Sequence, residues 1–412
     1  MVKLLVLADD FTGALDTGVQ FSNLGVETLV TTQVQLEQVK IPLNLEVLVV
    51  DTETRHVSDT AAYDLIHKLV EFAHRKNIPN IYKKVDSALR GNVSSEIKAL
   101  VDASASNHVA FLPAFPEMNR VVRDGILYID GLPVSESIFS EDPYEPVKES
   151  NILTRLKGEA GLDGILVKQG DEFAAQDPFH IFDAETDQDL KAIGMVLKEK
   201  GLLLVTVGCA GFAKILSHLL FKPTVSARSI RLKSLVVICG SVNEVTKNQV
   251  DYAQKQGALR VSLNSQQLFN KGYWTSQEGK NILSDILTKP GNQLLIFETF
   301  SEEISQEIKE LVRLGKLNSE QIRLDIGQTL GDLTQQILTQ APDRTLLLTG
   351  GDTLFQTMGV LKITDVKPIV EYEPGIVFSE IVWQGQPYQV LTKSGGFGKE
   401  SLFIALNQEA KE

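Results

Sequence analysis

The chain has 412 residues, of which 43% are hydrophobic and 23% are charged. This composition is typical of a folded globular protein and excludes a disordered or fibrous one, and the length predicts two domains or perhaps three. The formal net charge of -13 makes nucleic acid and anionic membrane surfaces unfavourable partners, although locally clustered cations can still hold a small anion.

The amino-terminal stretch predicts a strand, a polar turn and a helix. Residues 4–8 form an apolar run typical of a buried parallel strand, and residues 14–24 carry apolar side chains at helical spacing. Asp9 and Asp10 lie in the turn between them. Because ligands of open parallel sheets bind beyond the carboxyl ends of strands, both acids are candidate site residues. One of them can equally be a helix N-cap, but two adjacent acids cannot both cap one helix.

The first half of the chain continues as alternating strands and helices, which favours a parallel sheet with crossover helices. The predicted strands are 45–50, 81–84, 109–112, 164–167, 180–182 and 202–207, and the predicted helices are 59–74, 93–101, 191–200 and 212–220. Segment 115–146 interrupts the alternation with several Pro, Gly and charged residues. We therefore predict that it is a long functional loop or lid.

A polar stretch with one proline, residues 222–229, indicates a domain boundary. Beyond it, an apolar run from 235 leads into a helix at 244–256, and strands follow at 294–297 and 344–349. Segments 376–383 and 388–392 predict an antiparallel pair. The expected fold is thus two α/β domains with mainly parallel sheets, the second ending in an antiparallel strand pair. The predicted domains are residues 1–225 and 232–412.

Cysteine, histidine and hydropathy patterns limit the other possibilities. Cys209 and Cys239 are isolated at predicted strand ends, so each is expected to be a buried reduced thiol. The six histidines lack the spacing of a zinc site, and no metal-ligating residue is predicted. No basic and apolar signal pattern follows Met1, and no apolar run approaches the ~20 residues of a membrane span. We expect a cytoplasmic protein.

Three turns of the first domain follow predicted strands and so share one edge of the sheet. Besides Asp9 and Asp10, they contain the candidate substrate-binding residues Arg55, Lys83, Lys84, Asp86, Ser87 and Arg90. Arginine pairs with carboxylates and aspartate accepts from hydroxyl groups, which suits a small polyhydroxylated acid. Taken singly, the lysines fit a solvated strand end and Asp86-Ser87 fits a helix cap. Arg120 and Arg123 either close over this site or are solvated surface residues.

Three glycine-containing turns follow predicted strands of the second domain. They contain the candidate nucleotide-binding residues Ser241, Gly350, Gly351, Asp352, Thr353, Gly395, Gly396 and Gly398. Glycines let backbone amides approach a phosphate closely, and a helix amino terminus favours an anion. These turns fit a nucleotide, with Mg²⁺ shielding its phosphates, or plain helix caps. The spacing of neither a Walker A loop nor a dinucleotide fingerprint is present.

Taken together, the motifs resemble those of the four-carbon acid sugar kinases. ADDFTGA at 8–14 is similar to the amino-terminal signature of this family, and KKVDSALRGN at 83–92 to its second signature. TGGDT at 349–353 and KSGGFG at 393–398 resemble its carboxyl-terminal pair. The resemblance covers nearly the whole chain in the right order.

The resemblance implies an amino-terminal sugar-acid domain and a carboxyl-terminal ATP domain. The implied reaction moves the γ-phosphoryl group to the terminal hydroxyl of an acid such as threonate, erythronate or 3-oxotetronate. Carried over by position, Asp10, Arg55 and residues 83–86 would bind the acid, whereas Ser241, residues 350–353 and residues 395–398 would bind ATP.

Three questions stay open at the level of sequence. The catalytic base is Asp352 on the nucleotide side, or Asp10 or Asp86 on the acid side. The TGGDT turn also resembles that of molybdopterin-binding domains, and a non-catalytic sugar-acid sensor would keep the acid pocket alone. The stereoisomer of the acid is not readable, and a homodimer is the commonest expectation for assembly.

Overall fold

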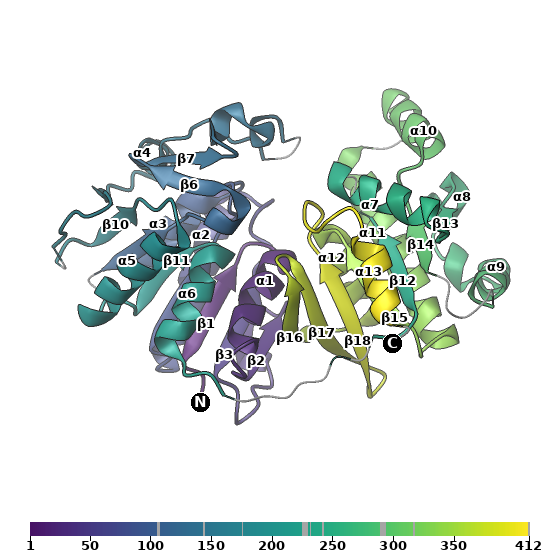
Figure 1. Cartoon of the computed structure of the whole chain (residues 1–412), viewed down its shortest axis with the longest axis horizontal. Coiled ribbons are helices and arrows are strands. Elements are labelled where there is room, and N and C mark those ends of the chain that lie inside the picture. The colour runs from purple at the N-terminus through teal and green to yellow at the C-terminus, as the bar shows by residue number, and fades with distance from the viewer. Residues whose placement is uncertain are drawn as a thin grey trace. The chain divides into compact units, whose positions relative to one another are not determined.

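A computed structural model describes residues 1–410 apart from 105–107, 143–144, 175, 225–229, 231, 241–242, 289–293 and 316–317. The chain divides into two compact units, Met1–Ser226 (unit 1) and Ala227–Glu412 (unit 2), which are coloured from purple to teal and from teal to yellow in Figure 1. Within the described residues, every helix is either too short or too polar to cross a bilayer.

Unit 1 is built on a parallel sheet. Its strands are β1 (Leu4–Ala8), β2 (Thr28–Thr31), β3 (Val47–Asp51), β4 (Asn80–Lys84), β5 (Val109–Leu112), β9 (Ile165–Val167), β10 (Phe179–Phe182) and β11 (Val205–Gly208). They lie in the order β2-β3-β1-β4-β11-β5-β10-β9. Neighbours in this order pair in parallel. Strands β1 and β3 are buried along their whole length, as expected when helices cover both faces of a sheet.

The crossover helices of unit 1 connect its strands in opposite directions along the sheet. They are α1 (Phe11–Ser22), α2 (Asp59–Arg75), α3 (Val93–Ala103), α4 (Ile152–Ala160), α5 (Asp187–Glu199) and α6 (Ala210–Leu220). Helix α6 packs against α1 and α5, whereas α2 packs against α3 on the other face (Figure 1). The chain leaves β1 toward β2 but leaves β4 toward β5, in opposite directions along the sheet. The turns after β1 and β4 therefore meet at a topological switch point, where α/β proteins bind ligands.

The segment predicted as a long loop contains a three-stranded antiparallel sheet, which we call the flap. Its strands are β6 (Arg120–Arg123), β7 (Ile126–Ile129) and β8 (Leu132–Pro133). Asp124-Gly125 and Asp130-Gly131 turn the two hairpins, and all four residues have positive φ angles. Asp-Gly between apolar segments is a strong hairpin signal, and the prediction of a loop overlooked it.

Unit 2 is also built on a sheet, whose strands are parallel except at one side. They are β12 (Leu235–Cys239), β13 (Leu259–Ser262), β14 (Leu295–Glu298), β15 (Thr345–Thr349), β16 (Asp365–Glu373), β17 (Ile376–Trp383) and β18 (Gln386–Lys393). Within unit 2 they lie in the order β13-β14-β12-β15-β18-β17-β16. Strands β13 to β18 in this order pair in parallel, and β18, β17 and β16 pair antiparallel.

The described helices of unit 2 are α7 (Glu244–Lys255), α8 (Ser265–Phe269), α9 (Gln277–Leu287), α10 (Glu302–Arg313), α11 (Ser319–Gln340), α12 (Gly351–Leu361) and α13 (Leu402–Glu409). Helices α7 and α13 cover one face, where Val250 and Phe403 join a core formed with strand residues such as Val237 and Phe378. The chain leaves β12 toward β13 and leaves β15 toward the other side, so unit 2 has a switch point of its own between these strands.

The predicted fold class is confirmed: both units are α/β with mainly parallel sheets, and the predicted antiparallel pair is β17 and β18. The prediction missed β16, which adds a third antiparallel strand. Cys209 and Cys239 are buried free thiols, as expected.

Candidate functional site

In unit 1, the register of the sheet brings the three predicted turns together. Ala8 pairs with both Asp51 of β3 and Lys84 of β4, so the three strands end at the same level. The residues after these ends are Asp9 and Asp10, the turn leading to Arg55, and the turn that contains Asp86. We call this edge the acid rim, because carboxylates and their cationic partners dominate it.

Arg55 holds the acid rim together. Its Nε and Nη2 donate to Asp9 Oδ2 at 3.0 and 2.9 Å, and Nη2 lies 3.0 Å from Asp10 Oδ1 and 3.6 Å from Asp86 Oδ1. Burial disfavours its charged form, but these three carboxylates raise the pKa of Arg55 well above its usual value. A guanidinium surrounded by carboxylates of its own chain has little capacity left for an anionic ligand.

Asp86 is held in place by the turn that follows it. Arg90 binds it in a bidentate manner, from Nε to Oδ2 at 3.0 Å and from Nη2 to Oδ1 at 2.9 Å. The backbone amides of Ala88 and Arg90 also donate to Oδ2. Burial opposes ionisation, but Arg90 and Arg55 outweigh it and hold the pKa of Asp86 well below its usual value. Asp86 is therefore an anion whose oxygens are already occupied.

Asp10 combines a structural contact with partial exposure. It is the N-cap of α1, accepting from the Gly13 amide at 3.1 Å, and its Oδ2 accepts from Thr12 Oγ1 at 2.7 Å. Burial opposes its ionisation, but Arg55 and Lys84 outweigh that cost and lower the pKa of Asp10. The cap and site interpretations of the sequence are thus compatible. A Cβ at Gly13 would lie 2.4 Å from Asp10 Oδ1 and 2.7 Å from Lys84 Nζ, so any larger residue here would displace these two side chains.

The two adjacent lysines have different environments. Lys84 Nζ lies at the amino terminus of α1 beside Asp10, within the acid rim. Lys83 is fully buried below the rim, where its Nζ lies 3.2 Å from Glu96 Oε2 and donates to Lys84 O at 2.8 Å. Thr54 Oγ1 donates to the other oxygen of Glu96. Burial raises the pKa of Glu96 despite Lys83. Lys83 thus positions the rim from beneath rather than facing it.

Two further residues belong to the rim: Asp51, which was not a sequence candidate, and Arg120, one of the two arginines that the sequence suggested could close over the site. Asp51 ends β3, and burial together with the charges of Glu53 and Asp10 raises its pKa well above the usual value. It is therefore a carboxyl group held toward its neutral form beside the ionised Asp10. Arg120 of the flap donates from Nη1 to Ser87 Oγ, so the flap reaches the rim. Arg123 lies on the same strand but pairs with Glu185 and is exposed.

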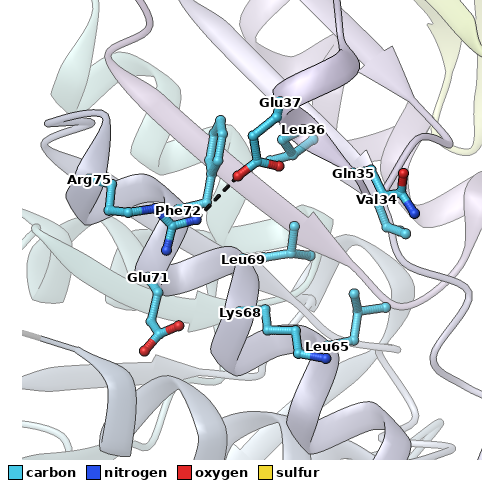
Figure 2. A pocket seen from close by; sticks show the side chains of 10 residues that line it. All are labelled: Val34, Gln35, Leu36, Glu37, Leu65, Lys68, Leu69, Glu71, Phe72 and Arg75. Atoms are coloured by element: carbon cyan, nitrogen blue, oxygen red, sulfur yellow. Dashed lines mark hydrogen bonds and ion pairs between the residues drawn. The ribbon is translucent and has the colours of Figure 1, made fainter.

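A separate groove of unit 1, of about 430 Å³, lies between α2 and the segment after β2 (Figure 2). Leu65, Leu69 and Phe72 contribute apolar side chains to it, and the ion pair between Arg75 and Glu37 spans it. None of the acid-rim residues lines this groove, and its charged groups are paired or solvated. The polar cluster, and not this groove, is the candidate site.

In unit 2, three strands again end at the same level of the sheet, so the turns that follow them begin at one edge. Thr349 of β15 pairs with Cys239 of β12 and with Lys393 of β18. Helix α12 begins at Gly351, and its N-cap Gly350 has φ = 103°, a conformation open to glycine. Asp352, in the first turn, pairs with Arg323 of α11. Ser241, the candidate after β12, lies outside the described residues.

Buried side chains donate hydrogen bonds to carbonyl oxygens of the third turn, residues 394–399, which we call the clamped loop. Gln249 Nε2 lies 3.0 Å from the carbonyl oxygens of Phe397, Gly398 and Lys399. Lys393 Nζ donates to Ser394 O at 3.1 Å and to Gly395 O at 3.0 Å.

Thr246 Oγ1 accepts from Lys393 Nζ at 2.9 Å and lies 2.8 Å from Gly395 O. Because these buried side chains bind its carbonyl oxygens, the clamped loop can present backbone amide groups to an anion, as phosphate-binding nests do. Lys393 belongs to the KSGGFG motif, but the sequence did not indicate its contacts or those of Gln249 and Thr246, because the direction of a buried side chain depends on tertiary packing.

Among the described residues, no group of three or more His, Cys, Asp or Glu side chains is placed to hold a metal ion. Mg²⁺ in phosphoryl-transfer sites is held largely by substrate phosphates with one or two carboxylates. Asp352 is the carboxylate that the α12 turn provides.

Comparison with known proteins gives consistent matches over both units. Residues 4–216 match the family model of a sugar-binding N-terminal domain, and residues 236–403 match that of a nucleotide-binding C-terminal domain. A D-threonate kinase of Salmonella typhimurium is 29% identical over 97% of this chain and 96% of its own. A 3-oxo-tetronate kinase of Brucella melitensis is 23% identical over 100% and 96%. A solved structure from Salmonella typhimurium, 20% identical and covering 98% of both chains, shares the fold with a TM-score of 0.80.

Proposed function

Because this chain belongs to the four-carbon acid sugar kinase family, we propose that it transfers the γ-phosphoryl group of ATP to the terminal hydroxyl of a four-carbon sugar acid. The observation that carries the proposal is the pair of strand-end sites, an acid rim in unit 1 and glycine turns in unit 2. Threonate, erythronate and 3-oxotetronate are the substrate candidates, since relatives are named as D-threonate and 3-oxo-tetronate kinases.

On the acid side, we assign contact with the substrate to Asp10, Lys84 and Ser87, because Asp10 and Ser87 are partly exposed and Lys84 Nζ lies beside Asp10. Asp9, Arg55, Asp86 and Arg90 form the ion-paired frame that orients them. Asp10 is the proton acceptor for the attacking hydroxyl in this proposal. Its pKa is lowered, so it is ionised at neutral pH, and its side chain is 18% exposed, against 8% for Asp86.

On the nucleotide side, the residues of unit 2 fit a triphosphate. The amino terminus of α12 at Gly350 and Gly351 and the amides of the clamped loop, including Gly395, Gly396 and Gly398, would hold its phosphates. Thr353 is buried beside Gly240, where it sets the packing between the turns. Asp352 would take part in holding Mg²⁺. Bound ATP supplies the electrophilic phosphorus, and the chain supplies positioning and charge stabilisation.

The decisive experiment is a turnover assay. Purified protein is incubated with ATP, Mg²⁺ and a panel of threonate, erythronate and 3-oxotetronate stereoisomers, and ADP release is measured. We expect one acid to give turnover well above the background without acid. If no acid in the panel gives ADP release, the kinase proposal is contradicted. If an acid binds but is not turned over, a sensor is favoured.

A homodimer and a cytoplasmic location stay predictions.

The clamped loop gives a prediction about ATP. Replacing Lys393 with methionine is expected to raise KM for ATP roughly tenfold and leave KM for the acid unchanged, because the carbonyl groups of Ser394 and Gly395 lose a charged donor. Steady-state kinetics with each substrate varied in turn measure both constants. Lys399→Met is the matched control, since Lys399 is an exposed residue of the same loop.

The same substitution changes the dependence on pH. Burial lowers the pKa of Lys393 to about 8, and the neighbouring Cys239, whose pKa burial raises to about 12, stays a neutral thiol. Wild-type affinity for ATP should therefore weaken as the pH rises through about 8, when Lys393 loses its proton. Lys393→Met should show no such change between pH 7 and 9. Equal pH profiles for the two proteins would contradict this role.

A further inference from the structure

Arg120 is carried to the acid rim by the base of the flap. Backbone hydrogen bonds with Phe115 fix its position, from Phe115 N to Arg120 O at 2.7 Å and from Arg120 N to Phe115 O at 3.1 Å. Its Nη1 donates to the hydroxyl of Ser87, a neutral group. Arg120 therefore belongs to the rim although it lies far from the other rim residues in sequence.

Within the described part of the chain, two of the three rim arginines form ion pairs with carboxylates, and the third, Arg120, does not. Arg55 contacts Asp9 and Asp10 at 2.9 and 3.0 Å. Arg90 contacts Asp86 at 2.9 Å and Asp142 at 3.1 Å. Among the described residues, by contrast, Arg120 forms no ion pair with a carboxylate, and Asp86 acts on its charge only from a greater distance.

The Arg120 guanidinium is also poorly solvated. Its Nε is buried and has no hydrogen-bond partner among the described residues. Burial lowers the pKa of Arg120, with Asp86 opposing the shift, yet a guanidinium stays protonated in proteins. A desolvated cation without a counter-ion is costly, and the cost is relieved when an anion binds it.

Phe139 holds the guanidinium in a fixed orientation. The Cζ atoms of Arg120 and Arg90 lie 5.2 and 5.1 Å from the centre of its ring. Cation–π contacts of this kind restrict a flexible side chain and leave its N–H groups available in the plane. Arg120 is thus a preorganised fork for a carboxylate, next to the hydroxyl of Ser87.

We propose that Arg120 binds the carboxylate of the substrate and thereby selects sugar acids over neutral polyols of the same length. This assignment rests on the proposed function of the acid rim and deepens it. Arg55, the arginine expected from the sequence to bind the carboxylate, becomes instead the residue that orients Asp9, Asp10 and Asp86.

The test compares Arg120→Gln with Arg123→Gln in the full-length protein. Arg123 is a matched control because it lies on the same strand, is exposed and pairs with Glu185. The probes are the acid identified by turnover, or threonate if there is none, and the neutral polyol threitol. Calorimetry without ATP gives both affinities. Arg120→Gln is expected to weaken acid binding about 10- to 100-fold and to leave threitol binding unchanged.

Further outcomes decide the proposal. Arg120→Lys should recover part of the acid affinity, because it restores the charge but not the fork. Equal weakening for acid and threitol would show a merely structural role and overturn the assignment, as would normal acid binding by Arg120→Gln. If Arg120→Gln loses acid binding selectively but the wild type never phosphorylates the acid, the role of Arg120 is supported and the kinase proposal fails. Turnover that survives Arg120→Gln with unchanged KM for the acid would overturn Arg120 alone.

Discussion

Asp10→Asn is expected to lower kcat with the four-carbon acid by roughly 100-fold or more, the usual contribution of a positioned proton acceptor. Asparagine caps a helix about as well as aspartate, so the start of α1 and its bond to Gly13 should survive. The substitution therefore separates the structural contact from the chemical one. Steady-state kinetics at saturating ATP measure the effect.

The control for this experiment is Asp187→Asn, which removes an exposed carboxylate from the first turn of α5 in the same unit. Its kcat should match the wild type. KM for ATP should be unchanged in Asp10→Asn, because the nucleotide turns lie in unit 2. Wild-type turnover in Asp10→Asn would exclude Asp10 as the base and direct the same experiment to Asp352 and then to Asp86.

Lys83→Met is expected to reduce the free energy of unfolding by about 3–5 kcal/mol at neutral pH, because it leaves Glu96 buried without its cation. The double variant Lys83→Met/Glu96→Met should regain most of this loss, since two apolar side chains replace the pair. Urea unfolding of the full-length chain measures both. Lys98→Met, which removes an exposed ion pair with Asp102 on the same helix, should cost less than about 1 kcal/mol.

The loss in Lys83→Met should also depend on pH. Burial already raises the pKa of Glu96 above the usual 4.5, and removing Lys83 raises it further. Folding then favours the protonated carboxyl group, so the penalty is small below pH 4.5 and grows as the pH rises above it. A deficit that is constant between pH 4.5 and 8 would contradict this explanation.

Much of the acid rim was predictable because the carboxyl ends of parallel strands share an edge. Asp9, Arg55 and Asp86 come from turns far apart in sequence, and the structure places them within one ion-paired cluster. The family resemblance is confirmed by the models that match both units. The roles of the individual residues stay predictions.

Other features required the tertiary structure. Lys83 and Lys84 are neighbours whose side chains point to opposite faces of β4, but helices cover both faces, so the sequence does not show which lysine reaches the rim. Glu96 looks like an ordinary residue in the first turn of a helix until Lys83 is placed beside it. Likewise, nothing in the local pattern around Gln249 indicates that its amide holds three carbonyl groups of a distant loop.

The flap has a consequence for how substrate preference can evolve. It is a small antiparallel sheet inserted after β5, and the pairing of Phe115 with Arg120 and the bridge between Val122 and Ala184 attach it to unit 1. Its second hairpin turn, Asp130-Gly131, is exposed, whereas the first is bound to Asp183 and the ion-paired frame of the rim belongs to the parallel sheet. On the proposed role of Arg120, mutations in the flap would change which acids bind and leave the ion-paired frame of the parallel sheet unchanged.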